Sequence, residues 1–217
     1  MKKLLLFLPA LLLFNFSNAQ VEKDATKAKQ ILDGVAQQTK SCSTIEISFS
    51  YTMEDKKKKI NETKTGTACM KGEKYWLDFA GQNIICDGKT IWTYIKDANE
   101  VQINTVNPDN DQSINPSKLL TTYDKNFTPK FIKEEPRAGK TIQIIDLTPM
   151  KGRSYYKIRV EIDKATKQIS KSIVYDKNGS TIYTYLVTKF TPNKVIADTK
   201  FTFKNSDHPG VEVVDLR

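Results

Sequence analysis

Few residues of this chain have the type and spacing that catalysis requires. His208 is the single histidine, and it stands in the loop Ser206-Asp207-His208-Pro209 without a patterned partner. A histidine of this kind is more often a surface residue than a general base. The chain also has no glycine-rich phosphate loop, no nucleophile elbow and no histidine-carboxylate metal motif. We therefore expect no catalytic residue, no metal site and no cofactor, and we interpret the chain as a binding protein.

Two other features could be mistaken for reactive sites. Asp87-Gly88-Lys89 lies between two alternating apolar runs, so a tight turn is a sufficient explanation. Cys42, Cys69 and Cys86 have neither metal-ligand spacing nor a redox motif, which favours small buried residues. Their odd number leaves at least one thiol unpaired in a monomer. One disulfide is possible in an oxidising compartment, and the sequence does not choose the pair.

The residues with the most regular spacing are apolar and aromatic. From Thr67 to Ile103, apolar residues recur at every second position, which predicts half-buried antiparallel strands. Alternation alone is compatible with ordinary core packing and with a ligand cavity. The cavity is favoured because about a dozen predicted strands would be covered by only one long and one short helix. The expected cavity lining is Tyr75, Leu77, Phe79, Trp92 and Tyr94.

The elements that must position these residues are mostly strands. Helical spacing of Ala28, Ile31, Leu32 and Val35 predicts an amphipathic helix over 24–38. Asn115-Pro116 predicts a short lid helix that carries Leu119, Leu120 and Tyr123. No linker divides the chain. Strands are expected at 44–53, 61–71, 74–80, 83–87, 90–95, 100–105, 127–134, 140–148, 154–163, 168–176, 180–191 and 199–204.

The first residues have the three parts of a secretory signal. A basic start, an apolar run from Leu4 to Phe14 and the small residues Ser17-Asn18-Ala19 predict cleavage after Ala19. The apolar run is too short to span a bilayer, which takes about 20 residues. Gln20 follows the cut, so the cysteine that a lipid-modified lipoprotein needs there is missing. We expect a signal peptide over 1–19, one exported domain over 20–217, and no lipid anchor.

The mature chain is basic but shows no nucleic-acid pattern. Loss of Lys2 and Lys3 with the signal lowers the net charge from +9 to +7. The lysines do not alternate with stacking aromatics, so we expect no nucleic-acid partner. The densest basic run is Lys56-Lys57-Lys58-Lys59. A solvated hairpin tip explains it, and attraction to anionic lipid headgroups is the alternative.

Against this background, several motifs resemble those of one family. Cys86-Asp87-Gly88-Lys89-Thr90-Ile91-Trp92-Thr93-Tyr94 resembles the aspartate-glycine-lysine, tryptophan, tyrosine signature of the periplasmic outer-membrane lipoprotein carriers, the LolA-like proteins. Phe201-Thr202-Phe203, Pro209-Gly210-Val211 and Asp215-Leu216-Arg217 resemble the last strand and tail of that family. The signal, the leading helix and the lid segment follow in the same order, so the resemblance covers the mature chain.

This resemblance implies a mainly β (α+β) fold, an unclosed antiparallel β-barrel of about eleven strands with a helical lid. It implies a periplasmic chaperone that holds lipoprotein acyl chains in a hydrophobic cavity and carries them from the inner to the outer membrane. The implied partners are acylated lipoproteins, an inner-membrane lipoprotein-releasing ABC transporter and an outer-membrane acceptor, with the chain as a monomer. Where such carriers often have Arg-Pro, this chain has Lys71-Gly72. Lys71 is therefore the gate candidate, without the planar fork of arginine.

Other functions fit the same shape. A lipoprotein- or lipid-sensing regulatory module of this fold is the main alternative. Because such sensors usually carry an additional domain, the end of the chain at Arg217 favours the carrier. An enzyme dependent on His208 is a distant third possibility. The sequence leaves the cargo open.

Overall fold

The computed structural model describes residues 14–106 and 123–217. Within these ranges twelve strands form a single sheet with the order β12-β6-β5-β4-β3-β2-β1-β11-β10-β9-β8-β7. The strands are β1 (Ile45–Asp55), β2 (Ile60–Lys71), β3 (Lys74–Phe79), β4 (Gln82–Cys86), β5 (Thr90–Ile95), β6 (Glu100–Thr105), β7 (Phe127–Arg137), β8 (Lys140–Pro149), β9 (Tyr155–Asp163), β10 (Gln168–Asp176), β11 (Thr181–Pro192) and β12 (Glu212–Asp215).

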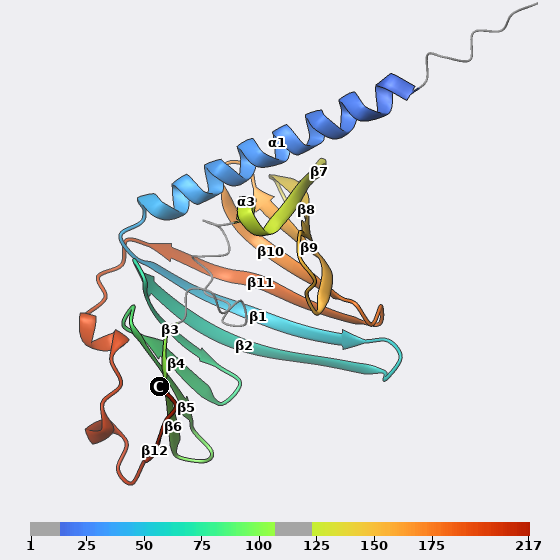
Figure 1. Ribbon diagram of the computed structural model, residues 1–217. Coiled ribbons are helices and arrows are strands. Elements are labelled where there is room, and N and C mark those ends of the chain that lie inside the picture. Colours follow the sequence, from blue (N-terminus) through green and yellow to red (C-terminus); the bar gives the residue numbers. More distant parts are fainter. Residues whose placement is uncertain (1–13, 107–122) are drawn as a thin grey trace, which may run out of the picture.

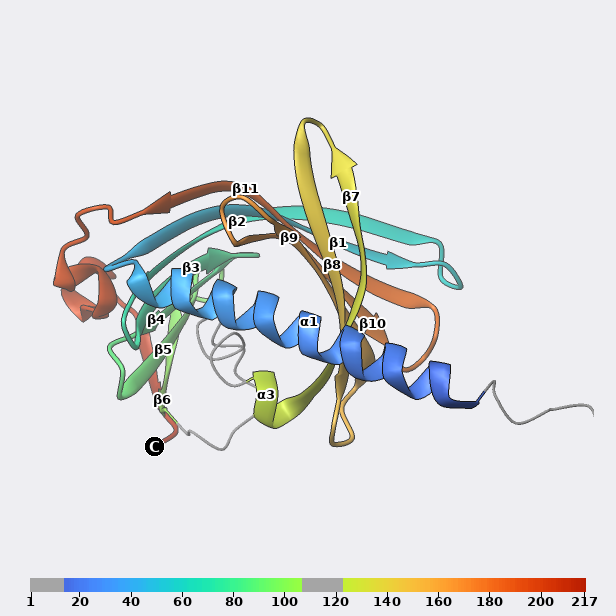
Figure 2. The same cartoon turned by 90° about the horizontal axis from the view of Figure 1, so that it is seen from above.

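The sheet is strongly curved and remains open. Every neighbouring pair is antiparallel except β12 and β6, which are parallel. The outer strands β12 and β7 do not pair with each other, so no closed barrel forms. Figure 2 shows the sheet arching over the long helix α1 (Phe14–Ser41). The predicted unclosed antiparallel barrel with a helical cover is thus confirmed, with twelve strands in place of about eleven.

Helix α1 lies on the concave side of the sheet, next to β7 and β10 (Figure 1). It buries Ala28, Leu32 and Val35, which are at most 1% exposed, in a core with residues of β8 and β9. This apolar spacing is the one that predicted a helix over 24–38. The helix begins earlier, at Phe14, because no proline or glycine interrupts the segment between Phe14 and Asp24. No helix in the described ranges is long and apolar enough to cross a membrane.

The C-terminal segment differs from the expectation. The strand predicted over 199–204 is wrong, because η1 (Asp198–Phe201) is a turn of 3-10 helix followed by irregular chain and η2 (Asn205–Asp207). Phe201 and Phe203 alternate as in a strand, yet both are buried without pairing in a ladder, and Phe203 packs with Ile85 and Val101 on the outside of the sheet. The last strand is β12, whose register runs from Glu212 beside Glu100 to Asp215 beside Ile103.

Candidate functional site

Strand register shows which residues share the concave face. Tyr75, Leu77 and Phe79 of β3 stand opposite Met70, Ala68 and Gly66 of β2. The same face continues into β1 because Gly66 stands opposite Phe49. Directly paired residues point to the same side of a sheet. Tyr75, Leu77 and Phe79 therefore share one continuous face with residues of β2 and β1.

Helix α1 covers the part of this face that lies away from β3, where it packs beside β7 and β10. Tyr51 of β1 stands opposite Tyr185 of β11, and Tyr183 stands opposite Val174 of β10. Val174 packs against the core cluster that contains Leu32 of α1. The chain of register links thus connects the β3 stripe to the helix side, across four strands. Tyr75, Leu77 and Phe79 lie on the concave face of the sheet.

Five rings on this face form a cluster that we call the concave aromatic cluster: Phe49, Tyr51, Phe79, Tyr183 and Tyr185. Tyr51 is at its centre, with ring centroids 5.2 Å from Tyr185, 5.3 Å from Phe79 and 6.1 Å from Tyr183. Phe49 and Phe79 are 5.6 Å apart. All five side chains are only half-buried. The cluster is thus an apolar surface that retains area for a ligand.

The hydroxyl groups of Tyr51 and Tyr185 are neutral. Burial, with smaller effects from Tyr51 and Tyr183, raises the pKa of Tyr185 to about 12. Burial likewise raises the pKa of Tyr51 above its usual value. Phenols with raised pKa values stay protonated at neutral pH, so they offer hydroxyl groups and no charge.

The face extends from Tyr75 and Leu77 into β4. Leu77 stands opposite Ile84 and Tyr75 opposite Cys86. Burial is the main cause that raises the pKa of the Tyr75 hydroxyl. Burial also raises the pKa of the Cys86 thiol, so this sulfur is a small apolar side chain rather than a nucleophile.

Trp92 and Tyr94 do not join this face. Trp92 stands opposite Ile85, which stands opposite Trp76, and all three lie on the convex face. They pack there with Phe203. The expectation that Trp92 and Tyr94 share a face with Tyr75 is wrong, because β4 separates the two strands and its odd and even positions point to opposite sides.

The C-terminal segment covers these convex aromatics. His208 stacks on Phe203 at a centroid distance of 4.6 Å and lies 4.1 Å from the ring of Tyr94. Tyr94 donates a hydrogen bond of 3.0 Å to Asn99, whose amide donates to the carbonyl of Pro209. His208 is thus a half-buried packing residue that helps to hold the tail.

Lys71, the gate candidate, also lies on the convex side. Its Nζ is 3.1 Å from Oδ1 of Asp198, and Lys74 is 3.2 Å from the same atom. These two lysines hold the pKa of the Asp198 carboxyl below its usual value. Among the described residues, the ammonium group therefore ties the end of β2 to η1 of the tail. A role in gating stays a prediction, and it would act through this tail.

The lid expectation falls partly outside the described residues, since Leu119 and Leu120 lie in the segment 107–122. Tyr123 begins α3 (Tyr123–Asn126) and is 4% exposed in the core beneath α1. Its hydroxyl donates a hydrogen bond of 2.6 Å to Asp33 of α1. Tyr123 therefore fastens the chain after this segment to the long helix.

The remaining candidate sites have structural explanations. Asp87 accepts hydrogen bonds of 2.8 Å from the backbone N–H groups of Lys89 and Thr90, as a tight turn requires. All three cysteines are free thiols. Cys69 stands opposite Trp76 on the convex face, whereas Cys86 is on the concave face.

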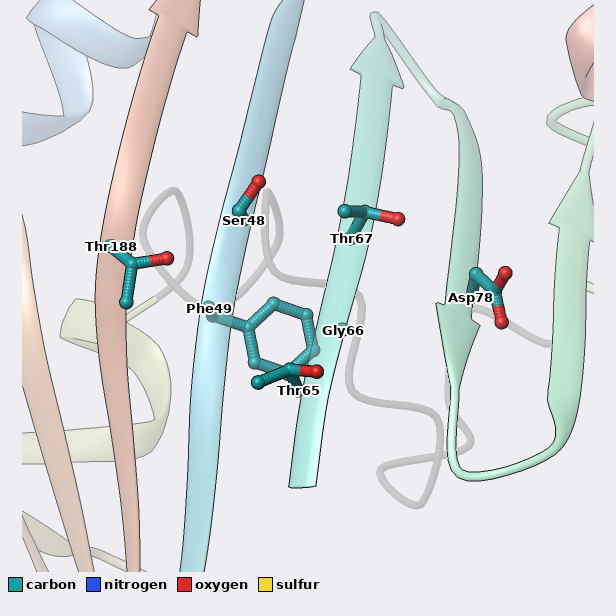
Figure 3. Close-up of a pocket in the computed structure, with 7 residues that line it drawn as sticks. All are labelled: Ser48, Phe49, Thr65, Gly66, Thr67, Asp78 and Thr188. Atoms are coloured by element: carbon teal, nitrogen blue, oxygen red, sulfur yellow. The ribbon is translucent and has the colours of Figure 1, made fainter. Parts of the chain in front are cut away.

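One depression on the convex face has a polar lining (Figure 3). Its volume is ≈ 430 Å³, and its lining residues are Ser48, Phe49, Thr65, Gly66, Thr67, Asp78 and Thr188. Gly66 has no side chain, and the Phe49 ring occupies the space that a Cβ at this position would need. Hydroxyl groups dominate the lining, so this depression is a different surface from the concave aromatic cluster.

Sequence reasoning missed four residues of that cluster: Phe49, Tyr51, Tyr183 and Tyr185. The alternation Phe49, Tyr51, Met53 and the pair Tyr183, Tyr185 are visible in the sequence. They could have been assigned to the same face only if β1 and β11 were known to be neighbours, since these strands are far apart in the chain.

Several solved structures are similar to this chain. An uncharacterized conserved protein from Thermus thermophilus has a TM-score of 0.60 and 12% identity, over 87% of this chain and 99% of that one. A putative outer membrane lipoprotein-sorting protein domain from Vibrio parahaemolyticus has a TM-score of 0.49 and 12% identity, over 82% and 97%. The MucA/MucB complex of Pseudomonas aeruginosa gives 0.47 and 14%, over 82% and 62%.

No curated protein matches the chain. The family model described as outer membrane lipoprotein carrier protein LolA matches residues 40–204. This range contains the eleven strands β1 to β11, including every residue of the concave aromatic cluster. Because the match spans most of the chain and the observed sheet is the open barrel that the motifs implied, the chain belongs to the LolA family.

Proposed function

We propose that this protein binds the acyl chains of lipoproteins on its concave face and carries them across the periplasm, from the inner to the outer membrane. It binds them without changing them chemically. The observation that carries this proposal is the concave aromatic cluster, whose rings are half-buried while the neighbouring core beneath α1 is closed. Its extension through Tyr75 and Leu77 adds apolar side chains of β3 and β4 to the same face.

Half-buried rings also suit a carrier energetically. Burial of an acyl chain contributes about 0.8 kcal/mol per methylene, so a dozen methylenes in a close-fitting site would contribute roughly 10 kcal/mol. Such cargo would leave too slowly. A broad surface of rings at different tilts, between 18° and 77°, contacts the chain less completely than a fitted tunnel and keeps release possible.

The proposal includes a route. Cleavage after Ala19 would release residues 20–217 as a monomer into the periplasm, with α1 shortened to begin at Gln20. An inner-membrane lipoprotein-releasing ABC transporter would load the concave face, and an outer-membrane acceptor would receive the cargo. Leu119, Leu120 and Tyr123 would form the lid, with Tyr123 as its anchor on α1.

The test is a matched pair of leucine substitutions. Leu77→Glu places a carboxylate on the concave face and should lower the affinity for a fluorescent fatty-acyl probe by at least tenfold. Leu186→Glu places the same group on the convex side of β11, where Leu186 is 42% exposed and pairs with Ser50, and should leave the affinity unchanged. Circular dichroism checks that both variants fold. Equal probe binding by both variants would refute the concave site.

Native mass spectrometry of the gently purified periplasmic protein identifies the cargo directly. Acylated lipoproteins or their lipidated fragments support the carrier. Handover of bound cargo to acceptor vesicles then separates the carrier from a sensor of the same fold, because a sensor would retain its ligand and respond through another protein.

A further inference from the structure

Three neighbouring loops form a basic edge at one end of the sheet. They are the β1–β2 hairpin, the β10–β11 hairpin and the loop between β8 and β9. The backbone N–H of Lys56 donates to the carbonyl of Ser180, and the N–H of Lys177 donates to the carbonyl of Ser154, so the loops are joined in series. Figure 1 shows the first two hairpins side by side at the same end.

We call this edge the basic rim and define it by its cationic residues: Lys56, Lys57, Lys58, Lys59, Lys151, Arg153 and Lys177. The ranges 55–60, 150–154 and 176–180 contain these seven basic residues and two acidic ones, a net charge of +5. The six lysines are exposed, and none of them forms an ion pair with a residue in the described ranges. The rim therefore presents uncompensated ammonium groups to solvent.

Both carboxylates of the rim accept hydrogen bonds within its turns. Asp55 is 5% exposed and accepts hydrogen bonds from the backbone N–H groups of Lys57 and Lys58 and from the hydroxyl of Thr181. Asp176 accepts a hydrogen bond of 2.8 Å from the backbone N–H of Asn178. Both carboxylates fix the turns that carry the lysines. The exposed charged side chains of the rim are therefore lysines.

An exposed apolar side chain stands within this edge. Met150 is 56% exposed and directly precedes Lys151. Its backbone N–H donates a hydrogen bond of 2.9 Å to the carbonyl of Asn126, so the loop is tied to the end of α3. A flexible thioether beside cations is the combination that inserts at a bilayer interface, where the apolar group enters the acyl boundary and the cations meet the headgroups.

We propose that the basic rim docks this protein on the surface of an anionic phospholipid bilayer, with Met150 inserted at the headgroup level. This proposal rests on the proposed function, because a carrier must approach a membrane to exchange cargo. The geometry supports the link, since Tyr183 of the concave aromatic cluster lies two residues from Thr181, which bonds Asp55 in the rim. A bilayer at the rim would thus lie beside the end of the apolar face.

The expected effect follows from the number of lysines. One lysine at an anionic membrane surface changes the partition constant by roughly fivefold, and the effect falls off within about 10 Å at 0.1 M salt. Removing four such charges should therefore weaken binding by at least about twentyfold, allowing for lysines that stand further from the surface. Loss of the Met150 side chain should weaken binding by about fivefold at any salt concentration.

The experiment is co-sedimentation of the mature protein with vesicles of phosphatidylcholine containing 30% phosphatidylglycerol, and with pure phosphatidylcholine vesicles as reference. The rim variant replaces Lys56, Lys57, Lys58 and Lys59 with glutamine. The matched control replaces four exposed lysines outside the rim with glutamine: Lys40, Lys167, Lys189 and Lys204. Both variants lose the same net charge. Met150→Ser is measured at low and high salt.

We expect wild type and the matched control to bind the anionic vesicles. The partition constant of the rim variant should be at least about twentyfold lower, and none of the three proteins should bind pure phosphatidylcholine strongly. Absence of wild-type binding to anionic vesicles, or equal losses in the rim variant and the control, would overturn the docking proposal. Probe binding in solution without vesicles is measured in parallel. If the rim variant fails on vesicles but binds the acyl probe, docking is separate from cargo binding; if wild type docks but binds no probe, the proposed function fails alone.

Discussion

A single methyl group at Gly66 tests the arrangement of the concave aromatic cluster. An ideal Cβ on this glycine would stand 2.5 Å from Cζ and 2.9 Å from Cε1 of Phe49, and 2.9 Å from the backbone oxygen of Asp78. The Phe49 ring can rotate, but it then loses its contact with Phe79 at 5.6 Å. The oxygen of Asp78 belongs to β3 and moves only if the strand moves. Gly66→Ala therefore forces a displacement within the cluster.

Two opposing effects set the magnitude. Alanine restricts the unfolded chain and, in an unstrained strand, would stabilise the protein by about 0.5–1 kcal/mol. Overpacking of a filled site costs typically about 1–3 kcal/mol. The second effect is larger, so we expect Gly66→Ala to lower the free energy of unfolding by about 1–2 kcal/mol. For a chain of this length the Tm should fall by about 3–6 °C.

Urea unfolding followed by tryptophan fluorescence, together with calorimetry, measures this change. Gly152→Ala is the matched control, because no atom lies within 4 Å of the Cβ added there. In a Phe49→Ala background, Gly66→Ala should cost less than in the wild type, since the ring contact is gone and only the Asp78 oxygen remains. A Gly66→Ala variant as stable as the wild type, or equal costs in both backgrounds, would refute the packing described for Phe49.

Three further outcomes are expected. Phe201→Ala should lower the free energy of unfolding by about 3–5 kcal/mol in urea titrations, because Phe201 is 0% exposed where the tail meets the sheet, and an unchanged midpoint would contradict that burial. Tyr123→Phe should lower the free energy of unfolding by about 1 kcal/mol, because it removes the hydrogen bond to Asp33, and a double-mutant cycle with Asp33→Ala should show this coupling. Lys164 and other hydrogen-bond donors lower the pKa of Glu134 to about 2, so its contribution to stability is complete above its usual pKa and is lost as the pH falls toward 2. Glu134→Gln should therefore flatten the acid limb of the stability profile, and an identical limb would show that this carboxyl is not the cause.

Much of the strand pattern could be predicted locally. Alternation between Lys74 and Phe79 and between Thr90 and Ile95 gave the strand bounds to within a residue, because side chains on a strand alternate strictly. The turn at Asp87 followed from the same reasoning, since aspartate and glycine suit the hydrogen bonds that close it. These features depend on neighbours in the sequence.

The pairing of distant segments could not be predicted in this way. Alternation placed Tyr75 and Trp76 on opposite faces correctly. It did not show which of these faces Trp92 shares, because that depends on the register in which β4 pairs with β3 and with β5. The same limit applies to Lys71. Its partner Asp198 comes from a tail far away in the chain, which alternation alone wrongly suggested to be a strand.

Local periodicity therefore predicted a mainly β chain, the bounds of β1 to β11 to within three residues, the apolar stripe of α1 and the stripe of β3, whereas the open barrel followed from the family resemblance. The pairing of β1 with β11, which brings Tyr51 between Tyr183 and Tyr185, depends on the folded chain as a whole, and so does the covering of the convex face by the C-terminal segment. Which face is covered and which stays half-exposed depends on long-range contacts. Periodicity defines two faces of a strand, and packing against distant parts of the chain decides which of them remains available to a ligand.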